Sequence, residues 1–342
     1  MDAAHRIHWN QLALPALFDA LARADAEIAV TRALAEDLGV VGDITSAASI
    51  PASMRGRAII VSREDGVLAG LPVAEIIARR AGLTLIAHTH DGARLARATK
   101  VATLEGPFAT LLAHERTILN FLTLLSGNAT HAARFVELVR STRAQVCDTR
   151  KTVPGLRTLQ KYATRCGGAT LHRIGLFDAV LLKDNHIGAF AAGSLADRVR
   201  SAARAARAHT PVAFVECEVD ALTQLDELLA LVAAEPGVLD MVLLDNMEPA
   251  MLAEAVRRRD ARAPGLLLEA SGGVRLDTVR AIAQSGVDRI SVGAITHSAP
   301  ALDLGLDLAL DLALDPALDL ALDPALDPAP NWDPTSTAEH RP

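Results

Sequence analysis

Short apolar runs alternate with amphipathic segments over the second half of the chain. The runs are rich in Val, Leu and Ile and have the length of buried strands. They cover residues 144–149, 177–184, 212–219, 239–246, 265–271 and 288–293, and helix-type segments such as 194–208 and 251–260 separate most of them. Strands that alternate with helices are usually parallel and joined by crossover connections. The pattern therefore predicts either a β/α barrel or an open doubly wound sheet.

Polar residues follow these apolar runs at their C-terminal ends. They are Asp148, Arg150, Lys183, Asp184, Glu218, Asp245, Ser271–Gly273 and Gly293. In a β/α barrel all such ends meet at one mouth, where the active sites of that architecture lie. An open sheet would bring together only the strand ends beside its switch point. Six polar ends in succession favour the barrel.

The first third of the chain has a mixed pattern. Residues 10–38 place apolar side chains three and four positions apart, which predicts an amphipathic helix. Short β-type runs follow at 57–62, 66–70 and 84–90. A helical stretch then extends from about 110 to 140, with an interruption expected near Gly127. These elements predict a small mixed α/β domain that precedes the barrel.

Residues 301–342 have low sequence complexity. Asp recurs every four positions from Asp303 to Asp327 with Leu beside it, so the first turns can form an amphipathic helix. Prolines at positions 316, 324, 328 and 330 oppose the continuation of that helix. We expect a disordered tail beyond about residue 312.

Charge is distributed unevenly along the 342 residues. The whole chain carries −7, but residues 301–342 carry −8 and residues 1–300 carry +1. Half of the residues are apolar, which is enough for a large core. A near-neutral body with one basic cluster argues against a general nucleic-acid binder and indicates a small polyanionic ligand. Three cysteines without metal-type spacing, and the lack of a signal-type N-terminus or a long apolar span, predict a cytoplasmic protein.

The basic cluster lies between residues 143 and 184, where eight Lys and Arg stand against three Asp. Its candidate ligand-binding side chains are Arg150, Lys151, His172, Arg173 and Lys183. Guanidinium groups form paired hydrogen bonds with carboxylates and phosphates, so this set indicates a ligand with several negative charges. The alternative is a group of solvated surface charges. We expect that alternative for Arg157, Lys161 and Arg165, whose spacing of four is typical of an exposed helix face.

Two acids, Glu218 and Asp245, end otherwise apolar strands. A carboxylate in that place needs a cation, a Mg²⁺ ion or a ligand hydroxyl, and the alternative is an ion pair with Lys183. Glu216 lies two positions earlier, so we expect it on the same face as Glu218 and deeper. Glycine turns at 271–274 and 291–294 follow the last two strands and are either phosphate cradles or ordinary tight turns.

Eight motifs resemble those of the quinolinate phosphoribosyltransferase family and occur in its order. They are ERTILNFLTLLSG (115–127), DTRKTVPGLR (148–157), GG-x-x-x-HR-x-GL-x-D (167–178), LLKDNHI (181–187), VECEVD (215–220), LLDNM (243–247), LEASGGV (268–274) and ISVGAITHS (290–298). The resemblance covers about residues 42–308. It implies an N-terminal α/β sandwich domain (1–117), an incomplete, open β/α barrel (118–298), and a segment (299–342) that begins with a helix returning to the first domain.

The resemblance also implies a reaction and a set of roles. Quinolinate and phosphoribosyl pyrophosphate would give nicotinate mononucleotide, pyrophosphate and CO₂ in NAD biosynthesis, with Mg²⁺ and in a homodimer. Arg116 would reach in from the partner subunit, and Arg150, Lys151, His172 and Arg173 would hold the two quinolinate carboxylates with Lys183 beside them. Glu218 and Asp245 would contact the ribose and Mg²⁺. The catalytic candidates are Lys151, Lys183, Glu218 and Asp245, and the expected 5′-phosphate site is Ser271, Gly272, Gly273, Ser291, Val292 and Gly293.

Two other functions stay open at this point. A related enzyme could act on another acidic ring such as nicotinate, although a single carboxylate would not need both Arg150 and Arg173. A non-catalytic barrel could bind an anionic metabolite, although two carboxylates in its mouth would add nothing to that function. The adjacent acidic pair with which many phosphoribosyltransferases hold the ribose is absent, as is normal for this family. The Asp-Leu-Pro tail is not part of the family pattern.

Overall fold

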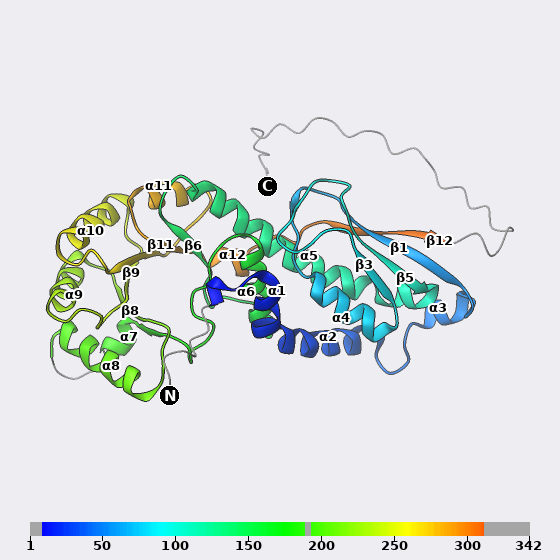
Figure 1. Ribbon diagram of the computed structural model, residues 1–342, viewed down its shortest axis with the longest axis horizontal. Helices are drawn as coiled ribbons and strands as arrows, with labels where there is room; N and C mark the ends of the chain where they lie inside the picture. Colours follow the sequence, from blue (N-terminus) through cyan, green and yellow to red (C-terminus); the bar gives the residue numbers. More distant parts are fainter. Residues whose placement is uncertain (1–8, 189–192, 311–342) are drawn as a thin grey trace, which may run out of the picture.

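The computed structural model describes residues 9–188 and 193–310, which form two parts built on two large sheets (Figure 1). The first part has an antiparallel sheet and the second a parallel one, so the expected α/β class with a mixed N-terminal domain and a β/α unit is confirmed. The disordered tail was predicted for residues that lie outside this described part. Within it, no helix has both the length and the apolar character needed to cross a membrane.

Four antiparallel strands form the sheet of the first part, in the order β12-β1-β5-β3. Their bounds are β1 Arg55–Ser62, β3 Thr84–Ala87, β5 Lys100–Pro107 and β12 Leu304–Leu310, and a separate pair is β2 Gly66–Val67 with β4 Arg94–Leu95. The three predicted strands are present with shifted ends. β4 and β5 were not predicted. β5 buries four consecutive residues from Val101 to Leu104, so the alternation that marks a half-exposed strand is missing.

The C-terminal segment forms a strand, so the helix predicted for it is wrong. β12 pairs antiparallel with β1, from Gly56 opposite Leu310 to Ser62 opposite Leu304. Leucine occupies every second position from 302 to 310, which suits a strand as well as the four-residue Asp period suits a helix. Leu304 is buried in the core of the first part, and Asp307 forms an ion pair with Arg63. Pairing with the edge of β1 decides between the two conformations.

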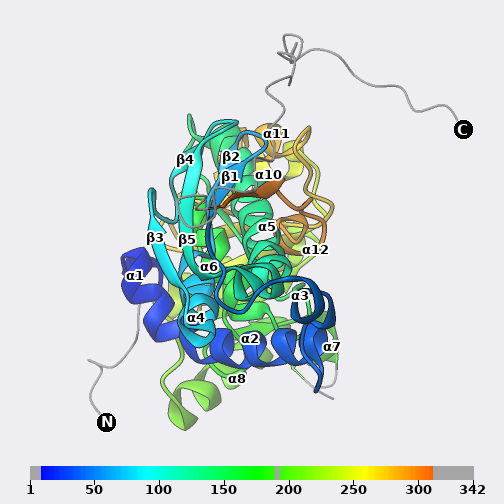
Figure 2. The same ribbon diagram turned by 90° about the vertical axis from the view of Figure 1, so that its right-hand side faces the viewer.

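Helices cover one face of the antiparallel sheet (Figure 1). Their bounds are α1 Leu14–Leu17, α2 Arg23–Leu38, α3 Ile44–Ser49, α4 Leu71–Ala81 and α5 Phe108–Val139, with a π-helical turn at Phe18–Ala22 and a 3₁₀ turn at Trp9–Gln11. Viewed along the long axis, α5 lies near the middle of the molecule (Figure 2). Its first turns belong to the core of the first part and its last turns to that of the second. α5 therefore joins the two parts.

α5 is continuous at Gly127, where the sequence predicted an interruption. A Cβ at this position would lie 2.1 Å from the carbonyl oxygen of Pro300. The glycine therefore allows the C-terminal segment to cross the helix at close range, and packing on both sides offsets its helical cost of about 1 kcal/mol. The predicted domain boundary at 117/118 falls inside α5, a helix that both parts share. The position of that boundary therefore stays a prediction.

Six parallel strands form the second sheet in the order β6-β11-β10-β9-β8-β7. Strand bounds are β6 Gln145–Cys147, β7 Val180–Leu182, β8 Val215–Val219, β9 Met241–Asp245, β10 Leu267–Ser271 and β11 Arg289–Ser291. Helix bounds are α6 Arg157–Cys166, α7 Asp184–Gly188, α8 Leu195–His209, α9 Leu222–Ala234, α10 Pro249–Arg262, α11 Val279–Gln284 and α12 Ala294–His297. Helices α8 to α11 lie outside the strands (Figure 1). Among the described residues no ladder joins β6 to β7, and a single bridge from Cys147 to Thr170 lies beside β6.

Candidate active site

The carboxyl ends of the six parallel strands surround a cavity of 830 Å³. It is lined by Thr149, Arg150, Lys151, His172, Arg173, Leu181, Lys183, Glu218, Leu243, Asp245, Asn246, Glu269, Ser271–Arg275, Ser291, Gly293, Ala294 and His297. Residues from all six strand ends meet here, as a barrel mouth requires. Cationic and anionic side chains therefore share one cavity, although they are scattered along more than a hundred positions.

Arg150 and Arg173 form a strongly basic part of the cavity. Arg173 is buried, and its Nη1 donates to the carbonyl of Ala179 at 3.4 Å. Burial and the nearby charge of Arg150 lower the pKa of Arg173. The Nε of Arg150 is buried without a hydrogen-bond partner among the residues that the structure describes. Neighbouring cations with an unused donor are costly to bury alone, so the pair suits an anion with two negative groups.

His172 lines the cavity and faces two buried glutamates, Glu216 and Glu269, of which Glu269 also lines the cavity. Its Nε2 is 3.0 Å from Oε2 of Glu216 and 3.2 Å from Oε1 of Glu269. Burial opposes a charge on the ring, but the two carboxylates outweigh burial and raise the pKa of His172 to about 10. Its Nδ1 accepts the backbone N–H of Arg173 at 2.8 Å, which requires a ring with one proton, at Nε2. The additional proton therefore belongs to the coupled pair of His172 and Glu216, and the pKa of Glu216 is likewise raised by burial and by Glu269.

The two glutamates and Arg289 form a compensated group beneath the cavity. Glu216 and Glu269 are fully buried, and Nε of Arg289 donates to Oε2 of Glu269 at 2.8 Å. Burial raises the pKa of Glu269, but His172 and Arg289 outweigh burial, and the net pKa is lowered. With one proton shared between His172 and Glu216, the two glutamates, the imidazole and the guanidinium are together neutral, which is the form in which such a group can be buried.

Strand periodicity predicts part of this group. The prediction that Glu216 lies deeper than Glu218 is confirmed, since Glu216 is fully buried and the side chain of Glu218 keeps 16% of its exposure. Glu269 was not predicted, although it lies two residues before Ser271 on β10, as Glu216 lies two residues before Glu218 on β8. That spacing is the signal that could have identified it.

Glu218 and Lys183 form an ion pair at the ends of β8 and β7. The ion pair considered as an alternative for Glu218 is therefore present. Both partners line the cavity, and the Lys183 side chain is 42% exposed, so a ligand can reach the pair. The neighbouring Asp245 accepts a hydrogen bond from Nδ2 of Asn246 at 2.7 Å through Oδ2. Its Oδ1 is left for a ligand or a cation.

Two groups of side chains offer ligands for a metal ion. His172, Glu216 and Glu269 place ligand atoms within 4.8 Å of one another. The His172 N–H and Arg289 already compensate these carboxylates, so the buried group fits a cation poorly. Glu218 and Asp245 present carboxylate oxygens to the open cavity, which is the donor type that Mg²⁺ prefers, with space for water or phosphate oxygens. The donor set therefore fits Mg²⁺ at the cavity.

Lys161 is fully buried, so the exposed face predicted from its spacing with Arg157 and Arg165 is wrong at this position. Its Nζ donates to both carboxylate oxygens of Asp148, at 2.8 and 2.7 Å. Asp148 supplies the opposite charge that a buried ammonium needs. α6 packs against α1, α2 and α5 of the first part and against α12, and residues 159–164 are all buried. The four-residue spacing identifies one stripe of the helix but not what covers it.

Two family models match the chain. The one for the N-terminal domain of quinolinate phosphoribosyl transferase matches residues 43–126, and the one for its C-terminal domain matches residues 128–307. The chain belongs to the quinolinate phosphoribosyltransferase family. The nicotinate-nucleotide pyrophosphorylase (carboxylating) of Mycobacterium leprae (strain TN) is 45% identical over 281 residues, 81% of this chain and 95% of that protein. A quinolinate phosphoribosyltransferase (decarboxylating) of Nicotiana tabacum is 36% identical over 285 residues, 80% of this chain and 79% of that protein.

Solved structures carry the same fold as this quinolinate phosphoribosyltransferase family member. The nicotinate-nucleotide pyrophosphorylase from Francisella tularensis has a TM-score of 0.75 and 34% identity, covering 88% of this chain and 98% of that one. The one from Ehrlichia chaffeensis has a TM-score of 0.73 and 35% identity, covering 82% of this chain and 98% of that one. The family resemblance of the eight motifs is thus confirmed.

Two residues that the family resemblance implies do not line the cavity of this chain. Arg116 is exposed on α5, and its role in a second subunit stays a prediction. Val292 is fully buried, and its N–H donates to the carbonyl of Cys147 at 2.9 Å. Four further polar side chains that were not predicted line the cavity, namely Thr149, Asn246, Arg275 and His297. His297 and Asn246 lie inside the recognised motifs, which is the signal that points to them.

The glycine turns of the family motifs form the edge of the cavity at the ends of β10 and β11. Gly272 and Gly273 have φ of 95° and 59°, which favours glycine at both positions. The side chain of Asn246 lies against this turn, and the backbone N–H of Asn246 donates to the carbonyl of Ser271 at 2.9 Å. At Gly293 a Cβ would lie 3.0 Å from Cδ of Lys151, so the lack of a side chain lets the lysine pass closely.

Proposed function

We propose that this protein transfers the phosphoribosyl group of phosphoribosyl pyrophosphate to quinolinate, with loss of CO₂, and so forms nicotinate mononucleotide for NAD biosynthesis. Membership of the quinolinate phosphoribosyltransferase family, through both domain models, supports the activity. The single observation that carries the residue roles is that Arg150 and Arg173 share one cavity with Glu218 and Asp245. An anionic ring and a cationic transition state need these two environments next to each other.

The basic part of the cavity binds quinolinate. Arg150 and Arg173 each take one of its two neighbouring carboxylates, since a guanidinium fork matches a carboxylate in geometry and charge. Lys151 lies beside them at the cavity edge and adds a third positive charge. His172 supports the pair from below through the N–H of Arg173. Nicotinate, with one carboxylate, would leave one of the two guanidinium groups without a partner.

The acidic part of the cavity binds the donor. Glu218 and Asp245 accept hydrogen bonds from the ribose hydroxyls. The same two carboxylates would hold Mg²⁺, which would supply positive charge for the departing pyrophosphate. The 5′-phosphate lies against the glycine edge at Ser271, Gly272, Gly273 and Gly293. At Gly273 an added Cβ meets nothing within 4 Å, so the backbone there is open to the phosphate. The sugar is thereby oriented with its anomeric carbon toward the quinolinate ring.

Transfer begins when the pyridine nitrogen attacks the anomeric carbon and the bond to pyrophosphate breaks. Positive charge develops on the ribose, and the carboxylate of Glu218 stabilises it while Lys183 keeps that carboxylate oriented. The ring nitrogen is then cationic, so the electron pair left at C2 by the departing CO₂ is stabilised within the ring. C2 finally takes a proton from water. The positive ring nitrogen serves as the electron sink, and the side chains of the cavity bind and orient the reactants.

We further propose a homodimer in which Arg116 of the partner subunit adds another cation to the quinolinate end of the cavity. The exposure of Arg116 on α5, away from the cavity of its own chain, supports this arrangement. We expect the enzyme in the cytoplasm, because its three cysteines are free and buried, as is usual in a reducing compartment.

Replacing Gly272 by alanine is expected to weaken binding of phosphoribosyl pyrophosphate. The new Cβ would lie 2.0 Å from the side-chain oxygen of Asn246, at a φ of 95° that alanine rarely adopts, so the turn must distort. We expect a roughly tenfold rise in KM for phosphoribosyl pyrophosphate and little change in KM for quinolinate. Gly265→Ala is the matched control, since a Cβ there meets nothing within 4 Å. Equal changes in both KM values would contradict the assignment of this turn to the phosphate.

The activity itself is tested by comparing quinolinate with nicotinate, each with phosphoribosyl pyrophosphate and Mg²⁺. We expect quinolinate to release one CO₂ per nicotinate mononucleotide formed. We expect kcat/KM for nicotinate to be lower than for quinolinate by about tenfold to a hundredfold, because one charge-assisted carboxylate contact is lost. Similar kcat/KM values for the two acids would contradict the proposed substrate. Tight binding of quinolinate without turnover would instead indicate a binding protein.

A further inference from the structure

Helix α6 contributes no residue to the cavity lining, yet two adjacent side chains on it are fully buried and polar. They are Gln160 and Lys161. A buried amide and a buried ammonium are each costly unless every donor finds a partner. Both side chains have partners, and two of these, Asp148 and Val153, lie on the loop that carries Arg150 and Lys151. We refer to Asp148, Gln160 and Lys161 as the clamp.

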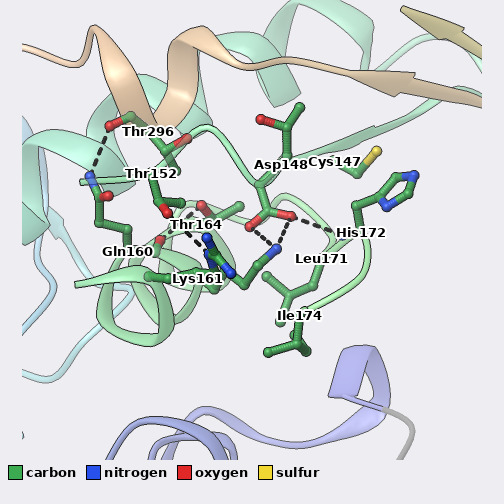
Figure 3. A network of polar contacts seen from close by, with 12 residues as sticks. Cys147, Asp148, Thr152, Gln160, Lys161, Thr164, Leu171, His172, Ile174 and Thr296 are labelled. Atoms are coloured by element: carbon green, nitrogen blue, oxygen red, sulfur yellow. Dashed lines mark hydrogen bonds and ion pairs between the residues drawn. The ribbon is translucent and has the colours of Figure 1, made fainter. Parts of the chain in front are cut away.

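The first half of the clamp is the contact between Lys161 and Asp148 (Figure 3). Asp148 is fully buried and lies just after β6, two residues before Arg150. Its Oδ1 also accepts the backbone N–H of His172 at 2.9 Å. One carboxylate therefore connects three pieces of chain, namely α6, the end of β6 and the segment that carries His172 and Arg173. Among the described residues, that segment joins the parallel sheet through a single bridge, from Thr170 to Cys147 beside β6.

The second half of the clamp is Gln160. Its Oε1 accepts the N–H of Val153 at 2.7 Å, and its Nε2 donates to the carbonyl of Thr296 at 2.8 Å. The hydroxyl of Thr296 in turn donates to the carbonyl of Lys151 at 2.7 Å. The loop from 148 to 153, with Arg150 and Lys151 in its middle, is thus held at both ends by consecutive residues of one helix.

Folding stability alone does not account for this arrangement. A buried ion pair often contributes little net stability, because the desolvation of two charges cancels most of their attraction. Lys161 and Asp148 nonetheless have no exposure, and the acid serves two donors at once. What the arrangement does supply is a definite distance between two segments that are more than twenty residues apart in sequence. Those segments carry Arg150 and Arg173.

We propose that the clamp is a positioning device that sets the separation of Arg150 and Arg173 and thereby selects a ring with two neighbouring carboxylates. This inference rests on the function proposed above and assigns part of the substrate specificity to residues that touch no substrate. Loosening the clamp weakens quinolinate binding and narrows the preference for quinolinate over nicotinate. Binding of phosphoribosyl pyrophosphate changes little, because its groups lie at the ends of β8 to β11.

The double variant Asp148→Asn with Lys161→Met tests the inference. It removes both charges together, so neither is left unpaired in the interior, and we expect its Tm to stay closer to wild type than that of Lys161→Met alone. We expect KM for quinolinate to rise roughly ten- to a hundredfold and KM for phosphoribosyl pyrophosphate to stay within about twofold. Gln160→Met is a second, uncharged variant that should shift the same KM in the same direction. Lys100→Met, at an exposed position of β5, is the matched control.

The outcomes separate the inference from the proposed function. Wild-type protein that neither binds nor turns over quinolinate overturns the function and the inference with it. The inference alone is overturned if the wild type is active and a folded double variant or Gln160→Met keeps the wild-type KM values. The same variant would also have to keep the wild-type ratio of quinolinate to nicotinate turnover. A parallel loss for both substrates also overturns it, because that result indicates general damage to the barrel. A selective rise in KM for quinolinate supports it.

Discussion

Replacing Glu218 by glutamine is expected to lower kcat by roughly 10²–10³, with smaller changes in either KM. The side chain keeps its shape but loses the negative charge that faces the ribose as it becomes cationic. The loss acts on the transition state more than on the ground state, so turnover suffers more than binding. The measurement is the steady-state rate of nicotinate mononucleotide formation, with the release of CO₂ from quinolinate followed in parallel.

The ion pair between Glu218 and Lys183 also allows a prediction of how KM changes in Glu218→Gln. Without its counter-ion, Lys183 becomes a stronger attractor of anionic substrates, so KM should not rise by much. Asp220→Asn is the matched control, since it removes an exposed carboxylate two residues further along, outside the cavity lining. A Glu218→Gln enzyme with nearly wild-type kcat and a raised KM for quinolinate would show that Glu218 only organises the basic residues.

The second large effect concerns stability at alkaline pH. The group of His172, Glu216 and Glu269 holds one proton more than the same residues hold in the unfolded chain, and the pKa of His172 is raised to about 10 from 6.5. A group with a raised pKa contributes its full stability below the unfolded value and loses it as pH rises through the folded one. We therefore expect the free energy of unfolding to fall between about pH 7 and pH 10, by up to about 1.4 kcal/mol per pH unit.

Glu216→Gln is expected to flatten this dependence. Glutamine still accepts the Nε2–H of His172 but cannot hold the additional proton, and the ring then faces only Glu269. The sign is the same whether the proton belongs to His172 or to Glu216, because both pKa values are raised. Urea unfolding at pH 7, 8, 9 and 10 measures the slope, and Glu105→Gln in the antiparallel sheet is the control for general titration. Parallel profiles of wild type and Glu216→Gln would contradict the assignment.

Much of the fold and of the cavity could be predicted from consecutive residues. The six apolar runs have the spacing of parallel strands with crossovers, and the polar residues at their ends converge because parallel strands bring their carboxyl ends to one edge. Arg150, Lys183, Glu218 and Asp245 were identified in this way and Arg173 from the basic cluster, and all five line one cavity. Periodicity along a strand also placed Glu216 deeper than Glu218. These are local properties of the chain, and they persist in the folded protein.

Other features depended on partners that are distant in sequence. Residues 304–310 have a two-residue leucine period, which is typical of a strand, and a four-residue Asp period, which is typical of a helix. Pairing with the open edge of β1 decides that they form a strand. Lys161 shares a helix stripe with Arg157 and Arg165, but whether that stripe meets water or a carboxylate depends on where Asp148 lies. Gly127 lies in an intact helix because another segment crosses it.

The sequence by itself determined which residues bear charge at the strand ends, because side-chain period and strand direction follow from neighbouring residues. The tertiary structure alone decided which of those charges are compensated in the interior and which are left for a ligand. The physical reason is that a buried charge is stable only beside its partner, and the two members of such a pair, as in Lys161 with Asp148 or Arg289 with Glu269, are brought together only by packing.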